Sequence, residues 1–195
     1  DRIRWVTSTC SHPDHSGAID ELIDRTGAER IELVDGDTIL GTEFRITAHD
    51  MGGPVANHKS FLLEEERTLI SGKLISEDLS IPLISEDSDL IQYHASFQKI
   101  MKMRLKRFAP AFGHVIEDPK GAVATTIDNF NKVDKEILKA IKKGATSPEE
   151  VVTANHSKIT DPEQAAEIAK SIEVHLTKLA DDKSVKQLKS GWKIR

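Results

Sequence analysis

The stretch Cys10-Ser11-His12-Pro13-Asp14-His15 decides how the rest of this chain is interpreted. It follows a short apolar run, Ile3 to Val6, and precedes a segment with helical spacing that begins at Gly17. This order predicts a strand, a polar turn and a helix, and the polar side chains can then point into the space above the strand end. Thiol, imidazole and carboxylate groups are all metal-ligand types. The same residues also suit a polar turn that caps a helix, so the stretch alone leaves both interpretations open.

Three later segments strengthen the metal-site interpretation. They are Asn57-His58-Lys59-Ser60-Phe61, Ile70-Ser71-Gly72-Lys73 and Pro110-Ala111-Phe112-Gly113-His114-Val115-Ile116-Glu117-Asp118-Pro119. Together with the first stretch, and in this order, they resemble the motif segments of the metallo-beta-lactamase superfamily, whose first motif is His-x-His-x-Asp-His. The resemblance is to the branch of glyoxalase II and beta-lactamase-like protein 2. It implies an α/β fold, the αββα sandwich of that superfamily, followed by a small C-terminal winged-helix-like domain.

The resemblance implies a dinuclear metal site, but most of its ligand positions are changed here. His12, Asp14 and His15 match the family motif. The other ligand positions hold, in chain order, Cys10, Pro54, Lys73 and Phe112. Cys10 is a soft replacement ligand, yet neither half of the site keeps the three protein ligands that a catalytic zinc ion needs.

Two functions therefore remain open. The first is a hydrolase-like protein with a degenerate site of His12, His15, Asp14 and Cys10, weakly active or inactive and without tightly bound metal. The second is an active hydrolase of an ester, thioester or phosphodiester that uses zinc or another divalent metal in a rebuilt site. In that case Asp14 is the catalytic candidate, because it would orient the nucleophile or hold the metal.

Lys73 stands where the family has a bridging aspartate. An ammonium group cannot bind a metal ion while it is protonated, but it places a positive charge beside Asp14 where the metal charge would be. We expect the two side chains to lie within salt-bridge distance, with His12 or His15 completing the hydrogen bonds. The alternative is a lysine that faces solvent at a strand end.

Four further residues are pocket candidates. His49 could rebuild a ligand set if its glycine-rich loop changed register, and His114 could still face the pocket. His58 is expected to be a hydrogen-bonded structural histidine. Phe112 is expected to fill volume and to exclude water at a ligand position.

Composition limits the remaining classes. The chain has 195 residues, of which 38% are hydrophobic and 30% charged, with a net charge of -5, as in an ordinary globular protein. The single cysteine excludes an intrachain disulfide, and with no apolar run long enough to span a membrane we expect a cytoplasmic protein. The acidic balance argues against a general nucleic-acid binder, although the basic tail keeps phosphate contact open. The small-molecule substrate is not specified by the sequence.

Periodicity and turn signals predict the elements in two domains, 1–143 and 144–195. Helices are expected at 17–25, 88–106 and 119–143, and from 147 and 161 onward. Strands are expected at 3–7, 31–34, 38–40, 43–48, 61–63, 68–70 and 107–111, with a hairpin over 184–195 and an irregular acidic segment over 75–89.

The start of the chain raises one more expectation. The family has several strands before the strand at 3–7, so the sandwich is expected to be incomplete at the N-terminus. If nothing replaces those strands, a sheet edge and an apolar face stay uncovered. Such surfaces favour pairing with a second copy, so we expect a homo-oligomer.

Overall fold

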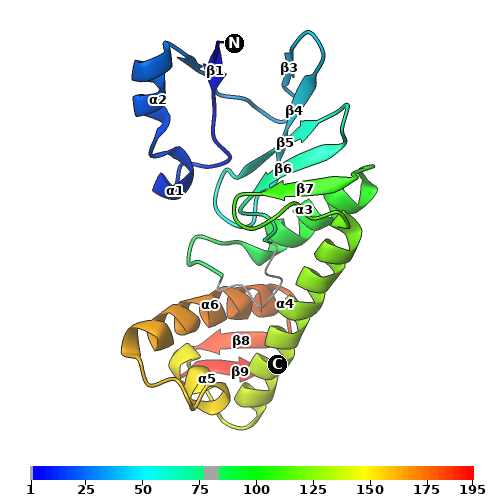
Figure 1. Ribbon diagram of the computed structural model, residues 1–195. Coiled ribbons are helices and arrows are strands. Elements are labelled where there is room, and N and C mark those ends of the chain that lie inside the picture. The colour runs from blue at the N-terminus through cyan, green and yellow to red at the C-terminus, as the bar shows by residue number, and fades with distance from the viewer. Residues whose placement is uncertain (1, 77–83) are drawn as a thin grey trace.

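A five-stranded sheet forms the centre of the computed structural model, which describes residues 2–76 and 84–195 (Figure 1). The strands run in the order β3-β4-β5-β6-β7, and only the β6–β7 pair is parallel. Their bounds are β3 Thr38–Leu40, β4 Arg45–Asp50, β5 Lys59–Leu63, β6 Thr68–Gly72 and β7 Arg107–Pro110. Every one of these strands matches a strand that the sequence predicts, with shifts of up to two residues at either end.

Two helices cover one face of this sheet. They are α3, Leu90–Lys102, and α4, Pro119–Lys142. The Asp89 side chain begins α3 by accepting hydrogen bonds from two backbone amides of its first turn. The core between sheet and helices is fully apolar at its centre, with Met51, Leu69, Phe97, Phe108 and Phe130 almost completely buried.

The N-terminal part lies beside the other face of the sheet (Figure 1). It contains β1, Trp5–Val6, which pairs in parallel with β2, Glu29–Arg30, and the helices α1, Pro13–Ser16, and α2, Ile19–Thr26. The strand predicted at 31–34 is therefore misplaced, because the residues that pair with β1 are Glu29 and Arg30, directly before that range. The polar turn predicted at the motif is itself helical, since Pro13 begins α1 there.

The C-terminal part contains two helices and a hairpin, in the predicted order. These elements are α5 Pro148–Asn155, α6 Pro162–Asp181, β8 Val185–Leu188 and β9 Gly191–Ile194. The side chains of Ser147 and Asp161 cap the two helices, and a proline follows each cap, as the sequence indicates. The likeness to a winged helix stays a prediction.

The helix α4 contributes to both cores. Phe130, in its first half, packs in the core under the sheet, whereas Ile137 and Ile141 pack with α5, α6 and the hairpin. Figure 1 shows α4 running from the sheet down to the C-terminal part. One continuous helix thus connects the two predicted domains.

The acidic segment predicted over 75–89 is only partly covered, because residues 77–83 lie outside the described residues. Residues 84–89 form turns and irregular backbone, in agreement with the prediction. Among the described helices, none is both long enough and apolar enough to cross a membrane.

Candidate functional site

Lys73 and Asp14 meet at the end of β6. Asp14 lies in the first turn of α1, and Lys73 directly follows Gly72, whose φ of 57° reverses the chain at the strand end. Lys73 Nζ lies 3.0 Å from Asp14 Oδ2, so the expected salt-bridge contact is present. The hydrogen bond from Lys73 lowers the pKa of Asp14 below its usual value, and desolvation acts against this shift. With side-chain exposures of 24% and 44%, the pair is partly open to solvent.

His12 extends this contact on the other side of Lys73. Its Nδ1 atom lies 2.9 Å from Lys73 Nζ, and because an ammonium group can only donate, this nitrogen accepts. The ring proton then resides on Nε2, which lies 3.4 Å from Asp87 Oδ2. The four side chains form one row in which each contacts the next, in the order Asp14, Lys73, His12 and Asp87.

Asp87 is a member of this row that the sequence analysis missed. It belongs to the acidic turn near Ser85 and Ser88, which looks in the sequence like a solvated loop. No local pattern indicates that this turn packs against the His12 motif, more than 70 residues earlier.

His15 lies behind Asp14 and is almost buried. Its Nδ1 atom is 3.3 Å from Thr9 Oγ1, and its Nε2 atom is 3.4 Å from Asp14 Oδ2 without the direction of a proper hydrogen bond. Burial lowers the pKa of His15, while the charge of Asp14 acts against this shift. The imidazole is therefore neutral at pH 7.

Phe112 packs edge-on against the His15 ring, with the ring centroids 5.8 Å apart. It is nevertheless 58% exposed, so the expectation that it fills volume and excludes water at a ligand position is wrong. Residues 111–115 are all exposed.

His58 has the structural role that the sequence analysis favours. Its Nδ1 atom is 3.1 Å from the Met51 carbonyl, and its Nε2 atom accepts a hydrogen bond of 3.1 Å from the Lys73 backbone amide. Burial lowers the pKa of His58 to about 4. The neutral ring thus fixes the backbone that presents Lys73.

The remaining candidates lie elsewhere. Cys10 is buried, and His114 is exposed in the loop after β7. His49, on β4, faces Asp35 with 4.0 Å between His49 Nδ1 and Asp35 Oδ1, in a cluster that also contains Lys99. The structure therefore gathers His12, Asp14, His15 and Lys73, and it leaves His49 in a separate polar cluster.

The donor set of the gathered residues does not fit a dinuclear metal centre. The Lys73 ammonium group lies against one oxygen of Asp14 and the lone pair of His12 Nδ1, where it would compete directly with a cation. Within residues 2–76 and 84–195, no group of three or more His, Cys, Asp or Glu side chains is arranged to hold a metal ion.

A small cavity of about 270 Å³ lies next to this row, lined among others by His12, Asp14, Lys73, Tyr93 and Phe112. The Tyr93 hydroxyl donates to the Leu74 carbonyl at 3.1 Å, which fixes the turn below Lys73. Ligand sites for small molecules usually enclose about 300 to 1,000 Å³. This cavity is therefore at the lower limit for a substrate pocket.

Known proteins resemble this chain in both sequence and structure, although no family model matches its sequence. The Beta-lactamase-like protein 2 homolog of Caenorhabditis elegans is 29% identical over 161 residues, which are 72% of this chain and 52% of that protein. The Lactamase-like protein aptB of Emericella nidulans is 25% identical over 206 residues, 94% of this chain and 65% of that protein. An Atrochrysone carboxyl ACP thioesterase of Claviceps purpurea is 26% identical over 148 residues, 70% of this chain and 46% of that protein. The chain thus spans between about half and two thirds of the length of these curated relatives.

Solved structures show the same fold. A metallo-beta-lactamase family protein from Thermus thermophilus superposes with a TM-score of 0.70 and 16% identity, covering 91% of this chain and 59% of that one. A beta-lactamase domain protein from Burkholderia ambifaria gives the same TM-score and covers 92% of this chain and 60% of that one. Two of the curated relatives carry related names, a beta-lactamase-like protein and a lactamase-like protein. The chain therefore has the metallo-beta-lactamase fold, and its sequence is similar to those of beta-lactamase-like proteins.

Proposed function

We propose that this chain is a hydrolase-like protein in which the ammonium group of Lys73 replaces the charge of a metal ion, and that metal-dependent hydrolysis is weak or absent. The observation that carries the proposal is the position of Lys73 Nζ, 3.0 Å from Asp14 Oδ2 and 2.9 Å from His12 Nδ1. Carboxylate and imidazole groups that would otherwise bind a cation are thereby satisfied by a side chain of the protein itself.

The chemistry of the superfamily explains why this substitution matters. A catalytic metal supplies a hydroxide nucleophile at neutral pH, and an ammonium group cannot do so. Lys73 can neutralise Asp14 and hold the end of β6 against α1, which is a structural task. The small volume of the adjacent cavity supports the same conclusion.

The second candidate is an active metal-dependent hydrolase of an ester, thioester or phosphodiester. It is supported by the name of the Claviceps relative, which is a thioesterase. This candidate requires that Lys73 leave its present partners and that donors outside the described cluster join Asp14, His12 and His15.

Metal analysis combined with turnover separates the two candidates. The chain is purified without chelator, and zinc, iron and manganese are measured by mass spectrometry. Hydrolysis of an acyl thioester and of bis-p-nitrophenyl phosphate is then followed with and without added zinc, with the Asp14→Asn variant as control. We expect well under one metal ion per chain and no zinc-stimulated turnover above that of the variant. Stoichiometric metal together with turnover that Asp14→Asn abolishes would establish the second candidate instead.

A further inference from the structure

Residues 84–89 lie between the helix α6 and the row of side chains around Lys73. We call this segment the strap, and we call the row the Lys73 row. Three residues of the strap, Ile84, Ser85 and Ser88, line the cavity of about 270 Å³ beside the row. The strap thus forms part of one wall of the site, and its position decides how open this side of the site is.

The strap is attached to α6 by a hydrogen bond and an ion pair. The Ile84 backbone amide donates to Ser171 Oγ at 3.1 Å, and the two residues are buried, with exposures of 4% and 7%. Further along the strap, Glu86 Oε2 lies 2.8 Å from Lys170 Nζ in an exposed ion pair. Loss of the acceptor for a buried amide is costly, whereas an exposed ion pair contributes little. The contact with Ser171 is therefore the stronger of the two attachments.

The end of the strap is attached to the loop between β4 and β5. Ser88 Oγ donates to the Pro54 carbonyl at 2.7 Å. The Asp89 backbone amide donates to the Gly53 carbonyl at 2.9 Å. Pro54 lines the same cavity as the strap, so this loop and the strap together form a continuous part of its wall.

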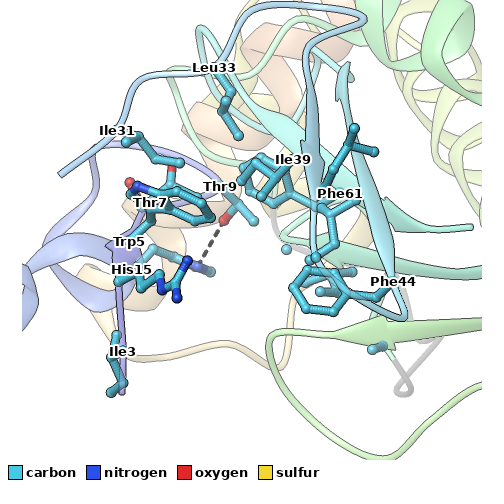
Figure 2. Close-up of a pocket in the computed structure, with 18 of the residues that line it drawn as sticks. Ile3, Trp5, Thr7, Thr9, His15, Ile31, Leu33, Ile39, Phe44 and Phe61 are labelled. Carbon is cyan, nitrogen blue, oxygen red and sulfur yellow. Dashed lines mark hydrogen bonds between the residues drawn. The ribbon is translucent and has the colours of Figure 1, made fainter. Parts of the chain in front are cut away.

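Asp87 lies between these two attachments and reaches the Lys73 row. Its Oδ2 atom lies 3.4 Å from His12 Nε2, while His12 Nδ1 lies 2.9 Å from Lys73 Nζ. Because the imidazole ring is rigid, a contact at Nε2 also fixes the direction of Nδ1. His15 is held differently, by Thr9, as the dashed line in Figure 2 shows. Asp87 is therefore a positioning residue for His12.

We propose that α6 controls access to the Lys73 row through the strap. With α6 in place, the strap closes one side of the cavity and holds His12 against Lys73. When the contacts of α6 with Ile84 and Glu86 are lost, the strap opens and Lys73 becomes accessible to small reagents. The proposal rests on the proposed function in one respect, since it takes Lys73, and no metal ion, as the group between Asp14 and His12.

The rate at which Lys73 is acetylated measures the opening. Each protein is treated at pH 8 with a limiting amount of sulfo-N-hydroxysuccinimide acetate, and peptide mass spectrometry compares Lys73 with exposed Lys189 of the same chain. In the parent, we expect Lys73 to react at least fivefold more slowly than Lys189. Ser171→Ala should raise the Lys73 rate at least threefold. Lys170→Gln should raise it less, because it breaks only the exposed ion pair.

Ser157→Ala and Lys158→Gln are the matched controls. Both residues are exposed in the loop before α6, and neither variant should change the Lys73 rate. Urea denaturation of each variant shows whether the chain is folded. Lys170→Gln changes an exposed side chain, so it tests the proposal even if Ser171→Ala does not fold.

Hydrogen exchange separates opening of the whole strap from a local effect. Ser171→Ala removes the acceptor of the Ile84 amide, so exchange of this amide rises in either case. The Asp89 amide donates to Gly53 and not to α6. Its exchange should rise at least threefold in Ser171→Ala, because the strap opens as one unit.

Two results would overturn the proposal. Unchanged Lys73 acetylation and unchanged Asp89 exchange in both Ser171→Ala and Lys170→Gln would show that α6 does not hold the strap. A parent in which Lys73 already reacts as fast as Lys189 would show that Lys73 is not held in the row, and this result would contradict the proposed function as well.

Discussion

His175 Nδ1 and Asp134 Oδ1 form a buried hydrogen bond of 2.7 Å between α6 and α4. Lys178 Nζ lies 2.8 Å from the other oxygen of the same carboxylate. Burial raises the pKa of Asp134, but the hydrogen bonds from His175 and Lys178 outweigh this effect and hold the pKa below its usual value. A single carboxylate thus joins two side chains of α6 to α4.

We expect Asp134→Ala to lower the free energy of unfolding by about 3 kcal/mol, because it leaves Lys178 and His175 without their buried partner. Urea denaturation at pH 7 measures this change. Asp128→Ala is the matched control, since Asp128 is exposed on the same helix, and it should change stability by less than about 0.5 kcal/mol. Equal losses in the two variants would mean that the buried contact contributes nothing.

Stability should depend on pH through His58. Its pKa is about 4 in the folded protein, below the ordinary histidine value of 6.5, so the unfolded chain takes up the proton first as the pH falls. The contribution of the neutral ring is complete above pH 6.5 and is lost progressively down to about pH 4. At about 1.4 kcal/mol for each pH unit between the two pKa values, the loss is on the order of 3 kcal/mol.

Nuclear magnetic resonance of the His58 ring checks this directly. Its Cε1 proton signal should not shift between pH 8 and about pH 5. Urea denaturation at several pH values then links the titration to stability. A His58 titration near pH 6.5 would contradict the expected sign and size of the effect.

Lys73→Ala should lower the melting temperature only slightly, because the contact with Asp14 is partly exposed and such pairs contribute little. Lys73→Asp should lower it more, since it places a second carboxylate beside Asp14. Excess zinc should then raise the melting temperature of Lys73→Asp and leave that of the parent unchanged. Lys135→Asp, at an exposed position of α4, controls for the charge change and should not respond to zinc. If the parent responds to zinc as strongly as Lys73→Asp, Lys73 does not exclude the ion.

Gly53→Ala should be strongly destabilising. A Cβ atom at Gly53, where φ is 129°, would lie 2.4 Å from the Tyr93 Cα atom in the first turn of α3. Gly36 also has a positive φ, but a Cβ atom there meets nothing within 4 Å. Backbone strain is common to both variants, whereas only Gly53→Ala also overpacks the site. Gly53→Ala should therefore lower the free energy of unfolding by about 2 kcal/mol more than Gly36→Ala. Thermal denaturation of the two variants measures the difference, and equal losses would exclude the steric cause.

Local signals predicted most of the helices and hairpins. The caps at Ser147 and Asp161, each followed by proline, fix where α5 and α6 begin, and the apolar stripe of α4 extends without interruption to its end. The strand near 31–34 was misplaced because a short apolar run does not specify which residues pair. The paired residues, Glu29 and Arg30, are charged and exposed, so hydrophobic periodicity gave no sign of them.

The candidate site was likewise predictable from the sequence only in part. The contact between Lys73 and Asp14 could be predicted, because the resemblance to the superfamily implies that these two positions face each other in one metal site. The partner of His12, Asp87, could not, because an acidic turn carries no information about what it packs against. The exposure of Phe112 was also missed, since residue type alone does not determine whether a loop turns its aromatic ring toward solvent.

The helix α4 has a consequence for how this chain could be divided. Its 24 residues supply Phe130 to one core and Ile137 and Ile141 to the other, so a cut after residue 143 would remove from the C-terminal part the helix that covers α6 and the hairpin. A fragment of residues 144–195 would then expose Leu176 and Trp192 to water. The smallest C-terminal piece that could be exchanged between proteins as a folding unit therefore begins inside α4, ahead of Val133. The first turns of the same helix pack in the core under the sheet.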